Sequence, residues 1–427
     1  MQVKALGLIC AVLAIAAVGC GGDDDDGGSG GNKVTLRYLT QVGETPRQEQ
    51  LAADIVKDFN EEHPNIEVKR EAITFDQLQT VIQTRLKSDD APDVFTYGPG
   101  EGFAGVLADA GLLYPLDDAY QQYGWKIYDW TKPGVTFDGT IYGVPDQLEA
   151  LGIFYNKDLF DEWGIGSPDD ADNFQAAVDR AKEEGLVPVA FGDKEGWEGG
   201  HVFSMGLSSA LERGQLSDLV AGKASWTEPE PTEAIRLMFV DLLEQGVYPE
   251  QPTGVNYDAA NALYYSQKSP MVMTGTWLAS EIAEKTKFES GFAAFPSLTG
   301  REANLATGVG GGWYVAEGTQ HPKEALVFLD WLLQRKNAER ALVELGDFPA
   351  QPIDVNVDDL DVPPLSKVVT ALISEVAPAG NVGYNLDVVM PPKFNETMFS
   401  GFQSVMTGDR TPEEQAAALQ EAAGGAG

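Results

Sequence analysis

The sequence predicts an α/β protein of two domains, each a mostly parallel sheet flanked by helices. Its 427 residues exceed one ordinary core, so two domains of about 150 to 200 residues are expected. Strand and helix patterns alternate from residue 34 to residue 97, which is typical of a parallel sheet. Between residues 137 and 160 the alternation stops, because a short polar patch joins two strand-like runs and leaves no room for a helix. We interpret this patch, which carries Asp146, Gln147 and Glu149, as a crossing between two lobes whose side chains face the gap.

The charge balance is strongly acidic. Lys and Arg total 29 against 66 Asp and Glu, a formal net charge of -37, while the hydrophobic content of 43% is that of a globular protein. Phosphate groups are held by basic side chains, so this balance argues against a nucleic-acid or anionic-membrane partner. It favours a solvated protein that acts on neutral or cationic ligands.

The N-terminus is typical of an exported lipoprotein. Lys4 precedes an apolar run over residues 5–18 that is too short for a comfortable membrane span, so residues 1–19 are predicted to be a signal peptide. Residues 17–20, AVGC, resemble the bacterial lipobox, in which the cysteine is acylated, although Ala17 stands where Leu is more usual. We expect lipid on Cys20 to anchor the protein on the outer face of the cytoplasmic membrane, with residues 20–32 as the lipidated Cys and a flexible Gly/Asp tether. The alternative is a plain signal peptide with an incidental cysteine.

The first domain begins with alternating elements. Strands are predicted over residues 34–40, 66–73 and 94–97, and helices over residues 51–59, ended by Pro64, and 75–87. This order implies a parallel sheet with right-handed crossovers, and such sheets hold ligands beyond the carboxyl ends of their strands. Gln41, Glu44 and Tyr97 occupy those ends.

A glycine-rich segment follows the third strand. Residues 100–105, GEGFAG, match G-x-G-x-x-G, but the next helix is short and no second strand closes on an acidic ribose ligand. A nucleotide site is therefore rejected. We interpret these glycines as letting the backbone approach a ligand or another segment of the chain.

The rest of the chain continues with α/β patterns. Residues 270–277 predict a buried strand that runs into a turn presenting Trp277, and residues 290–296 predict a strand that returns to the first lobe. A glycine-rich approach at residues 308–312 leads into a further strand. The C-terminal part is predicted to be helical over residues 365–377, 392–406 and 412–422.

Five segments carry a resemblance to a known family: residues 91–95 (APDVF), 141–145 (IYGVP), 154–160 (FYNKDLF), 273–277 (MTGTW) and 311–315 (GGWYV). Taken in this order, they resemble the extracellular solute-binding proteins of carbohydrate ABC importers, the maltose-binding-like group in its lipoprotein variant. The resemblance implies a two-lobed periplasmic-binding-protein-like fold of type II with hinge crossings. It further implies a monomer without a cofactor, located extracellularly or in the periplasm, that delivers solute to an ABC permease. We expect lobe 1 to comprise residues 33–145 and 296–348, and lobe 2 residues 146–295 and 349–427.

A sugar site needs aromatic plates for the apolar ring face and polar groups for the hydroxyls. Tyr97 and three tryptophans are candidate plates, acidic and amide side chains are candidate polar groups, and the resemblance adds a glycine whose backbone faces ligand. The predicted ligand-binding residues are Gln41, Glu44, Tyr97, Asp146, Glu149, Trp197, Trp277, Gly311, Trp313 and Asn385.

Two other functions stay open. A lipid-anchored glycoside hydrolase would use two cleft carboxylates such as Asp146 and Glu149, and a binder of a polyamine or a peptide fits the acidic charge. Metal and triad catalysis are poorly supported, because His63, His201 and His321 are far apart and lack zinc-site spacing. The expected function is therefore capture of a neutral sugar or oligosaccharide, without catalysis or a metal. His201, beside two glycines and near Trp197, is the histidine of most interest.

Overall fold

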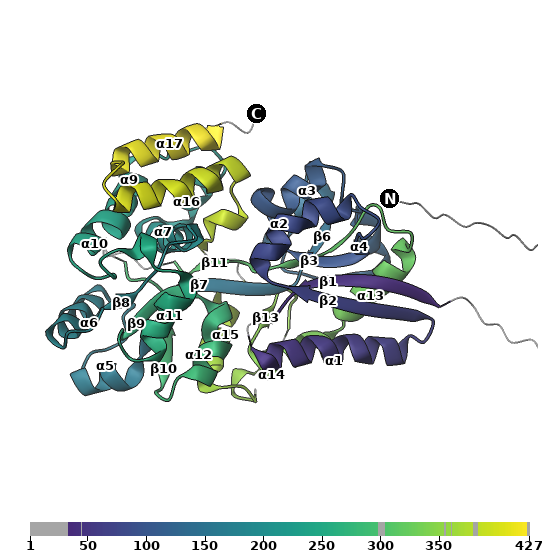
Figure 1. Ribbon diagram of the computed structural model, residues 1–427, viewed down its shortest axis with the longest axis horizontal. Coiled ribbons are helices and arrows are strands. Elements are labelled where there is room, and N and C mark those ends of the chain that lie inside the picture. The colour runs from purple at the N-terminus through teal and green to yellow at the C-terminus, as the bar shows by residue number, and fades with distance from the viewer. Residues whose placement is uncertain are drawn as a thin grey trace, which may run out of the picture.

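The computed structural model describes residues 33–43, 45–297, 304–353, 356–359, 361–378 and 383–424. They form two lobes, seen side by side in Figure 1, with the N-terminal strands in one lobe and the C-terminal helices on the other. The two-lobed α/β fold class is therefore confirmed. Glu44 and Cys20 lie outside the described residues. Among the described helices, none has both the length and the apolar character needed to span a membrane.

The first lobe is built on a sheet of order β2-β1-β3-β12-β6. Strands β1 (Val34–Gln41), β2 (Ile66–Ile73) and β3 (Val94–Tyr97) pair in parallel, as predicted. Strand β12 (Gly312–Val315) runs antiparallel to both β3 and β6 (Gly143–Pro145). Four of these five strands therefore share one direction, and the expected mostly parallel sheet is confirmed for this lobe.

The second lobe departs from the predicted parallel sheet. Its central strand β7 (Gln147–Asn156) pairs antiparallel with β9 (Met271–Gly275), β10 (Ser290–Ala293), β11 (Ala306–Val309) and β13 (Phe348–Pro349). In this lobe, parallel pairing among the described residues is limited to β8 with β9 and β11 with β14. Strand β7 carries the chain into this lobe and β11 carries it back toward the first, so these two adjacent strands run in opposite directions.

The predicted return to the first lobe at residues 290–296 is wrong. Strand β10 stays in the second lobe, where Phe292 is opposite Phe154 of β7. Strand β11 also pairs with β7, so the chain reaches the first sheet only at β12, after Gly310 and Gly311. An apolar strand fits either lobe equally well, and only its pairing partner decides which one holds it.

Helices cover both sheets. Thr45 caps α1 (Pro46–Glu62) and Thr74 caps α2 (Phe75–Leu86). In each case the threonine hydroxyl accepts the backbone N–H of a glutamine three residues later, and the side-chain oxygen of that glutamine accepts the backbone N–H of the threonine. The remaining α-helices are α3 (Val106–Asp109), α4 (Asp117–Tyr123), α5 (Lys157–Trp163), α6 (Ala171–Glu183), α7 (Trp197–Ala210), α8 (Arg213–Val220), α9 (Pro229–Arg236), α10 (Leu242–Glu244), α11 (Tyr257–Tyr265), α12 (Ala279–Lys285), α13 (Pro322–Leu332), α14 (Arg335–Leu345), α15 (Pro364–Val376), α16 (Pro392–Met406) and α17 (Pro412–Gly424).

Several short elements link these helices. The π-helical turns are η1 (Glu101–Gly105) and η3 (Leu237–Asp241), and the short strands are β4 (Thr136–Phe137), β5 (Thr140–Ile141), β8 (Val189–Ala190) and β14 (Gly383–Tyr384). The 3₁₀-helices are η2 (Asp129–Val135), η4 (Pro252–Gly254), η5 (Thr276–Leu278), η6 (Val357–Asp359) and η7 (Leu386–Val388).

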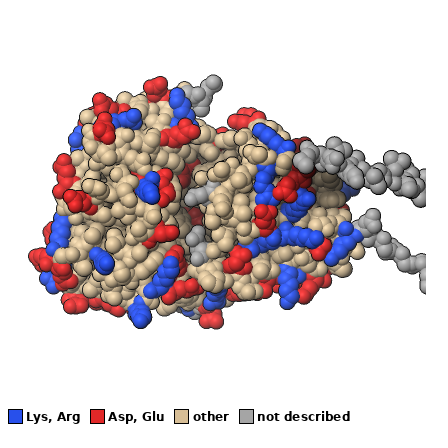
Figure 2. Space-filling model, in the orientation of Figure 1, with Lys and Arg blue, Asp and Glu red and all other residues tan. Residues whose placement is uncertain are grey.

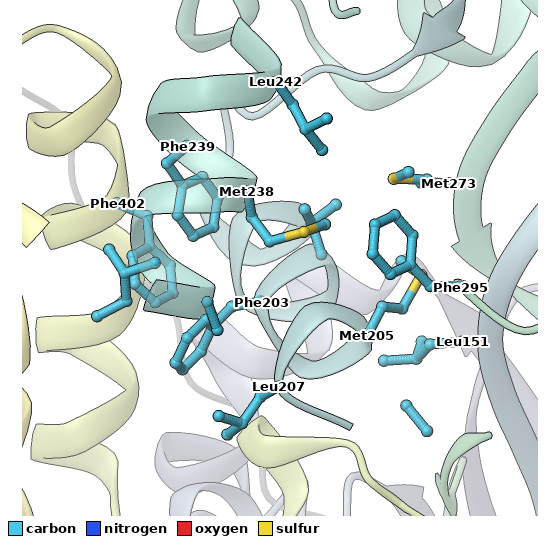
Figure 3. Close-up of a cluster of buried hydrophobic side chains, with 14 of the residues drawn as sticks. Leu151, Phe203, Met205, Leu207, Met238, Phe239, Leu242, Met273, Phe295 and Phe402 are labelled. Carbon is cyan, nitrogen blue, oxygen red and sulfur yellow. The ribbon is translucent and has the colours of Figure 1, made fainter. Parts of the chain in front are cut away.

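The second-lobe core holds the C-terminal helices in place. Phe402 of α16 stacks on Phe239 at a centroid distance of 4.3 Å and packs on Phe203 of α7 at 4.8 Å. Figure 3 shows these rings grouped with Met205 and Met238. Each such side chain stabilises the fold by about 1.5–3 kcal/mol through burial. The segment after residue 383 is thereby fixed beside α7, which brings residues far apart in sequence to one surface.

Candidate ligand-binding site

The lobes meet along a furrow that is visible in Figure 2. The backbone around Asp146 is hydrogen-bonded to the other segments that cross between the lobes. The Asp146 N–H donates to the Gly311 carbonyl at 3.1 Å, and the Ala350 N–H donates to the Asp146 carbonyl at 2.9 Å. The Gly310 N–H donates to the Gln147 carbonyl at 3.0 Å. The stretch that the sequence marks as a crossing is thus hydrogen-bonded to the two later crossings. We call residues 146–149, 310–311 and 347–350 the hinge.

Glycine is required at two hinge positions. A Cβ on Gly310 would lie 2.2 Å from Cδ of Glu149, and a Cβ on Gly311 would lie 2.9 Å from Oδ2 of Asp146. Side chains here would therefore displace the two carboxyl groups. The structure places the predicted residues Asp146, Glu149 and Gly311 together.

The hinge carboxyls sit in an unusual electrostatic environment. The Asp146 Oδ1 accepts the Gln147 N–H at 2.6 Å, and the Gln147 side chain donates to Glu149 Oε1 at 2.7 Å. Although both acidic side chains keep part of their surface exposed, burial raises the pKa of Asp146 to about 7. Burial and the neighbouring Asp146 charge raise the pKa of Glu149 to about 8, and burial raises that of Asp347 to about 6. Near neutral pH Asp146 and Glu149 are therefore protonated for a substantial part of the time, so each carboxyl group can donate as well as accept a hydrogen bond.

An aromatic wall lies in the second lobe, formed by Trp197, His201, Tyr257 and Trp277. The Trp277 indole N–H donates to the Tyr257 hydroxyl at 2.8 Å, and the Trp197 ring lies 4.8 Å from the Tyr257 ring. The His201 ring lies 5.1 Å from Trp197 and 5.3 Å from Trp277. Trp277 lies in the turn η5 after β9, as predicted, whereas Trp197, which we expected in a glycine-rich loop over residues 192–200, is the first residue of α7. Two of the predicted aromatic plates therefore share one surface.

The C-terminal segment completes this wall. The His201 Nε2 lies 2.9 Å from Oδ2 of Asp387. Asp387 lies in η7, and Asn385 immediately precedes this turn. His201 is 6% exposed and Asp387 7%, while Nδ1 of His201, Oδ1 of Asp387 and Oδ1 of Asn385 have no protein partner. The negative charge of Asp387 also contributes to the raised pKa of Glu149. The carboxylate beside the wall therefore interacts electrostatically with a hinge carboxyl group.

The remaining predicted residues are more dispersed. Gln41 is exposed at the end of β1, and its backbone N–H donates to Thr96. Tyr97 packs edge-to-face on Phe103 at 6.0 Å, and burial raises its pKa to about 12. Trp313 packs on the first-lobe core and donates its indole N–H to Tyr38 at 3.2 Å. The ligand roles of these residues stay predictions.

Sequence reasoning missed several members of the wall. Tyr257 and Asp387 were not identified, and His201 was noted without a role. Asp387 and His201 are separated by 186 residues, so no motif connects them. Glu198 was also missed: it is 3% exposed, accepts the Thr274 hydroxyl at 3.4 Å, and burial raises its pKa well above the ordinary value. Within the described residues, no group of three His, Cys, Asp or Glu side chains is arranged to hold a metal ion.

Comparison with known proteins agrees with this architecture. The chain is 28% identical over 339 residues to the multiple sugar-binding protein of Streptococcus mutans serotype c, an alignment that covers 76% of each chain. A solved structure from work on xylan utilization by Caldanaerobius polysaccharolyticus superposes with a TM-score of 0.79 at 24% identity, covering 91% of this chain and 99% of the other. A chitin oligosaccharide binding protein superposes with a TM-score of 0.78 at 23% identity, covering 92% and 98%.

The family comparison is broader. The model of the bacterial extracellular solute-binding protein family matches residues 43–339, which include β2, β3, β6 and β12 of the first sheet and β7 to β11 of the second. The matched stretch spans well over half of the 427 residues, and it includes Asp146, Glu149, Gly310 and Gly311 of the hinge and all four wall side chains. The chain belongs to the bacterial extracellular solute-binding protein family.

Proposed function

We propose that this protein captures a neutral sugar or oligosaccharide between its lobes and delivers it to the permease of an ABC importer. The aromatic wall is the observation that carries the proposal. Trp197, Tyr257 and Trp277 offer aromatic faces of the kind that pack on the apolar face of a sugar ring. The bond from Trp277 to Tyr257 holds two of these side chains in fixed orientation.

The hinge carboxyls supply the polar half of the proposed site. Sugar hydroxyls both donate and accept, so a site for them benefits from groups that do the same. Asp146 and Glu149, with pKa values raised to about 7 and about 8, are such groups near neutral pH. A neutral ligand also avoids adding a charge to a partly buried site.

The names of the relatives agree with this ligand class. The Streptococcus mutans relative is a multiple sugar-binding protein, and a structural neighbour is a chitin oligosaccharide binding protein. The chain is proposed to bind without catalysis, as a monomer, exported and anchored through lipid on Cys20. Its partner is proposed to be the transmembrane part of the importer.

A thermal-shift screen tests the proposal. The purified protein is heated with neutral mono- and oligosaccharides, and with polyamines and short peptides as controls. Ligand at about 100 times its Kd stabilises the folded state by about 2.7 kcal/mol, so one sugar class is expected to raise the Tm. A rise with polyamines or peptides alone, or release of reducing sugar from the glycans, contradicts the proposal.

A matched pair of variants tests the wall. Trp277→Ala is expected to abolish the sugar-induced rise, because it removes one aromatic face and the partner of Tyr257. Trp163→Ala, in α5 and bonded instead to Glu184, serves as the control and is expected to keep the response. Equal responses from both variants would place the ligand elsewhere.

A further inference from the structure

A turn of the first lobe contacts the C-terminal part of the second lobe. The turn, Glu101–Gly105 with the preceding Gly100, follows β3, and its Ala104 is buried in the first-lobe core. The segment 386–395 contributes Leu386, Met390 and Phe394 to the second-lobe core. We call these the docking turn and the docking segment. Their contact therefore joins the two lobes directly, without passing through the hinge.

Glycine is what permits this contact. A Cβ on Gly100 would lie 1.8 Å from the Val388 carbonyl oxygen, and a Cβ on Gly102 would lie 2.6 Å from Nδ2 of Asn395. At Gly100 the clash is with backbone and cannot be relieved by a side-chain movement, and Gly100 also has a φ of 87°, whereas at Gly102 the Asn395 side chain would have to move. The interpretation that the glycines of residues 100–105 admit another segment of the chain is confirmed.

The docking turn is shaped within its own lobe. The Gly100 N–H donates to the Gly134 carbonyl at 2.6 Å, and the Gly105 N–H donates to the Gly100 carbonyl at 2.9 Å. Both partners belong to the first lobe, so the turn keeps its form when the lobes separate. The contact with the docking segment, by contrast, crosses from one lobe to the other.

Asp387 connects the docking segment with the aromatic wall. Its carboxylate meets His201 at 2.9 Å, while its backbone carbonyl accepts the Asn395 side-chain N–H at 2.7 Å. Asn395 is the side chain that faces Gly102, and Val388, which faces Gly100, is the next residue along the chain. A single residue therefore contacts both the wall and the surface on which the other lobe docks.

We propose that Asp387 is a positioning residue that couples ligand capture to lobe closure. Its bond to His201 fixes the docking segment in the form that receives Gly100 and Gly102, and a ligand on the wall strengthens that form. The ligand part rests on the proposed function, whereas the docking contact does not. A ligand favours closure only through interactions that differ between the open and closed states, and in this proposal the docking contact is one of them.

The docking contact is tested without ligand by small-angle X-ray scattering on the purified protein. Gly100→Ala places a methyl group against Val388, so we expect a larger radius of gyration than that of the wild type. Gly111→Ala is the matched control, because Gly111 also has a positive φ of 66° but nothing within 4 Å of its added Cβ. It is expected to keep the wild-type radius. Equal radii for Gly100→Ala and the wild type overturn the docking contact.

The role of Asp387 is tested by a conservative pair. Asp387→Ala removes the partner of His201 and is expected to open the protein as Gly100→Ala does. It is also expected to weaken binding of the sugar class found in the screen by about tenfold or more, equivalent to about 1.4 kcal/mol. Asp387→Asn keeps an oxygen that accepts from His201 and is expected to restore closure. Wild-type closure in Asp387→Ala, or no rescue by asparagine, overturns the coupling.

The two proposals fail in different ways. If no sugar binds the wild type, the proposed function fails, while the scattering comparison still decides the docking contact. If sugar binds all variants with equal affinity and equal radii, the proposed function stands and the coupling is refuted.

Discussion

Replacing Asp146 with asparagine is expected to change how the stability of the protein depends on pH. Burial raises the pKa of Asp146 from its ordinary 3.8 to about 7, with Asp347 contributing and N–H donors partly opposing. The folded state therefore keeps this proton over a pH range in which the unfolded chain has released it. Because the folded state binds more protons, stability is highest below the unfolded pKa and is lost as pH rises toward the folded value.

The magnitude follows from the linkage. Each pH unit within this window changes the free energy of unfolding by about 1.4 kcal/mol per group, so from about pH 5 to about pH 7 the wild type loses up to about 2.7 kcal/mol through Asp146. Asp146→Asn keeps an oxygen that accepts from the Gln147 N–H but does not titrate. Its stability relative to the wild type is therefore expected to rise by about that amount over the same interval.

Urea denaturation of both proteins at the two pH values measures this difference. Asp169→Asn, which removes an exposed carboxylate, is the control for loss of one negative charge. Its stability relative to the wild type is expected to stay nearly constant. If Asp146→Asn shows the same advantage at both pH values, Asp146 does not hold a proton in the folded state and the account of the hinge is refuted.

Three further outcomes are expected. Gly310→Ala forces a methyl group against Glu149 and should lower the free energy of unfolding, measured by urea denaturation, by about 1–3 kcal/mol. Gly318→Ala, whose added Cβ has nothing within 4 Å, should leave it nearly unchanged, and equal losses in the two variants would contradict the crowding at Gly310. Asn156→Ala removes the bond from the Leu159 N–H at the start of α5 and should cost about 1 kcal/mol, with Asn156→Asp retaining the cap. Binding of the neutral sugar, followed by calorimetry, should hardly change between low salt and about 0.5 M salt, and a strong decrease would favour a cationic ligand.

The sequence determined the local elements and the site chemistry they carry. Apolar periodicity gives α1, which ends before Pro64, and α2, and the strand-like runs that alternate with these helices give the parallel strands β1, β2 and β3. The turn after β9 presents Trp277 as expected, because a buried strand followed by small residues is a local pattern. The polar patch at Asp146 is also recognisable locally, because the two strand-like runs around it are too close together for a helix to lie between them.

The tertiary structure decided which distant residues meet. Strand β10 carries the same apolar pattern that either sheet would accept, and its pairing with β7 is set only when the crossings are in place. His201 and Asp387 lie 186 residues apart, and Gly100 touches Val388 only because α16 packs on the second-lobe core. Such contacts depend on how two lobes and a C-terminal segment pack together, which leaves no periodic signal in the sequence.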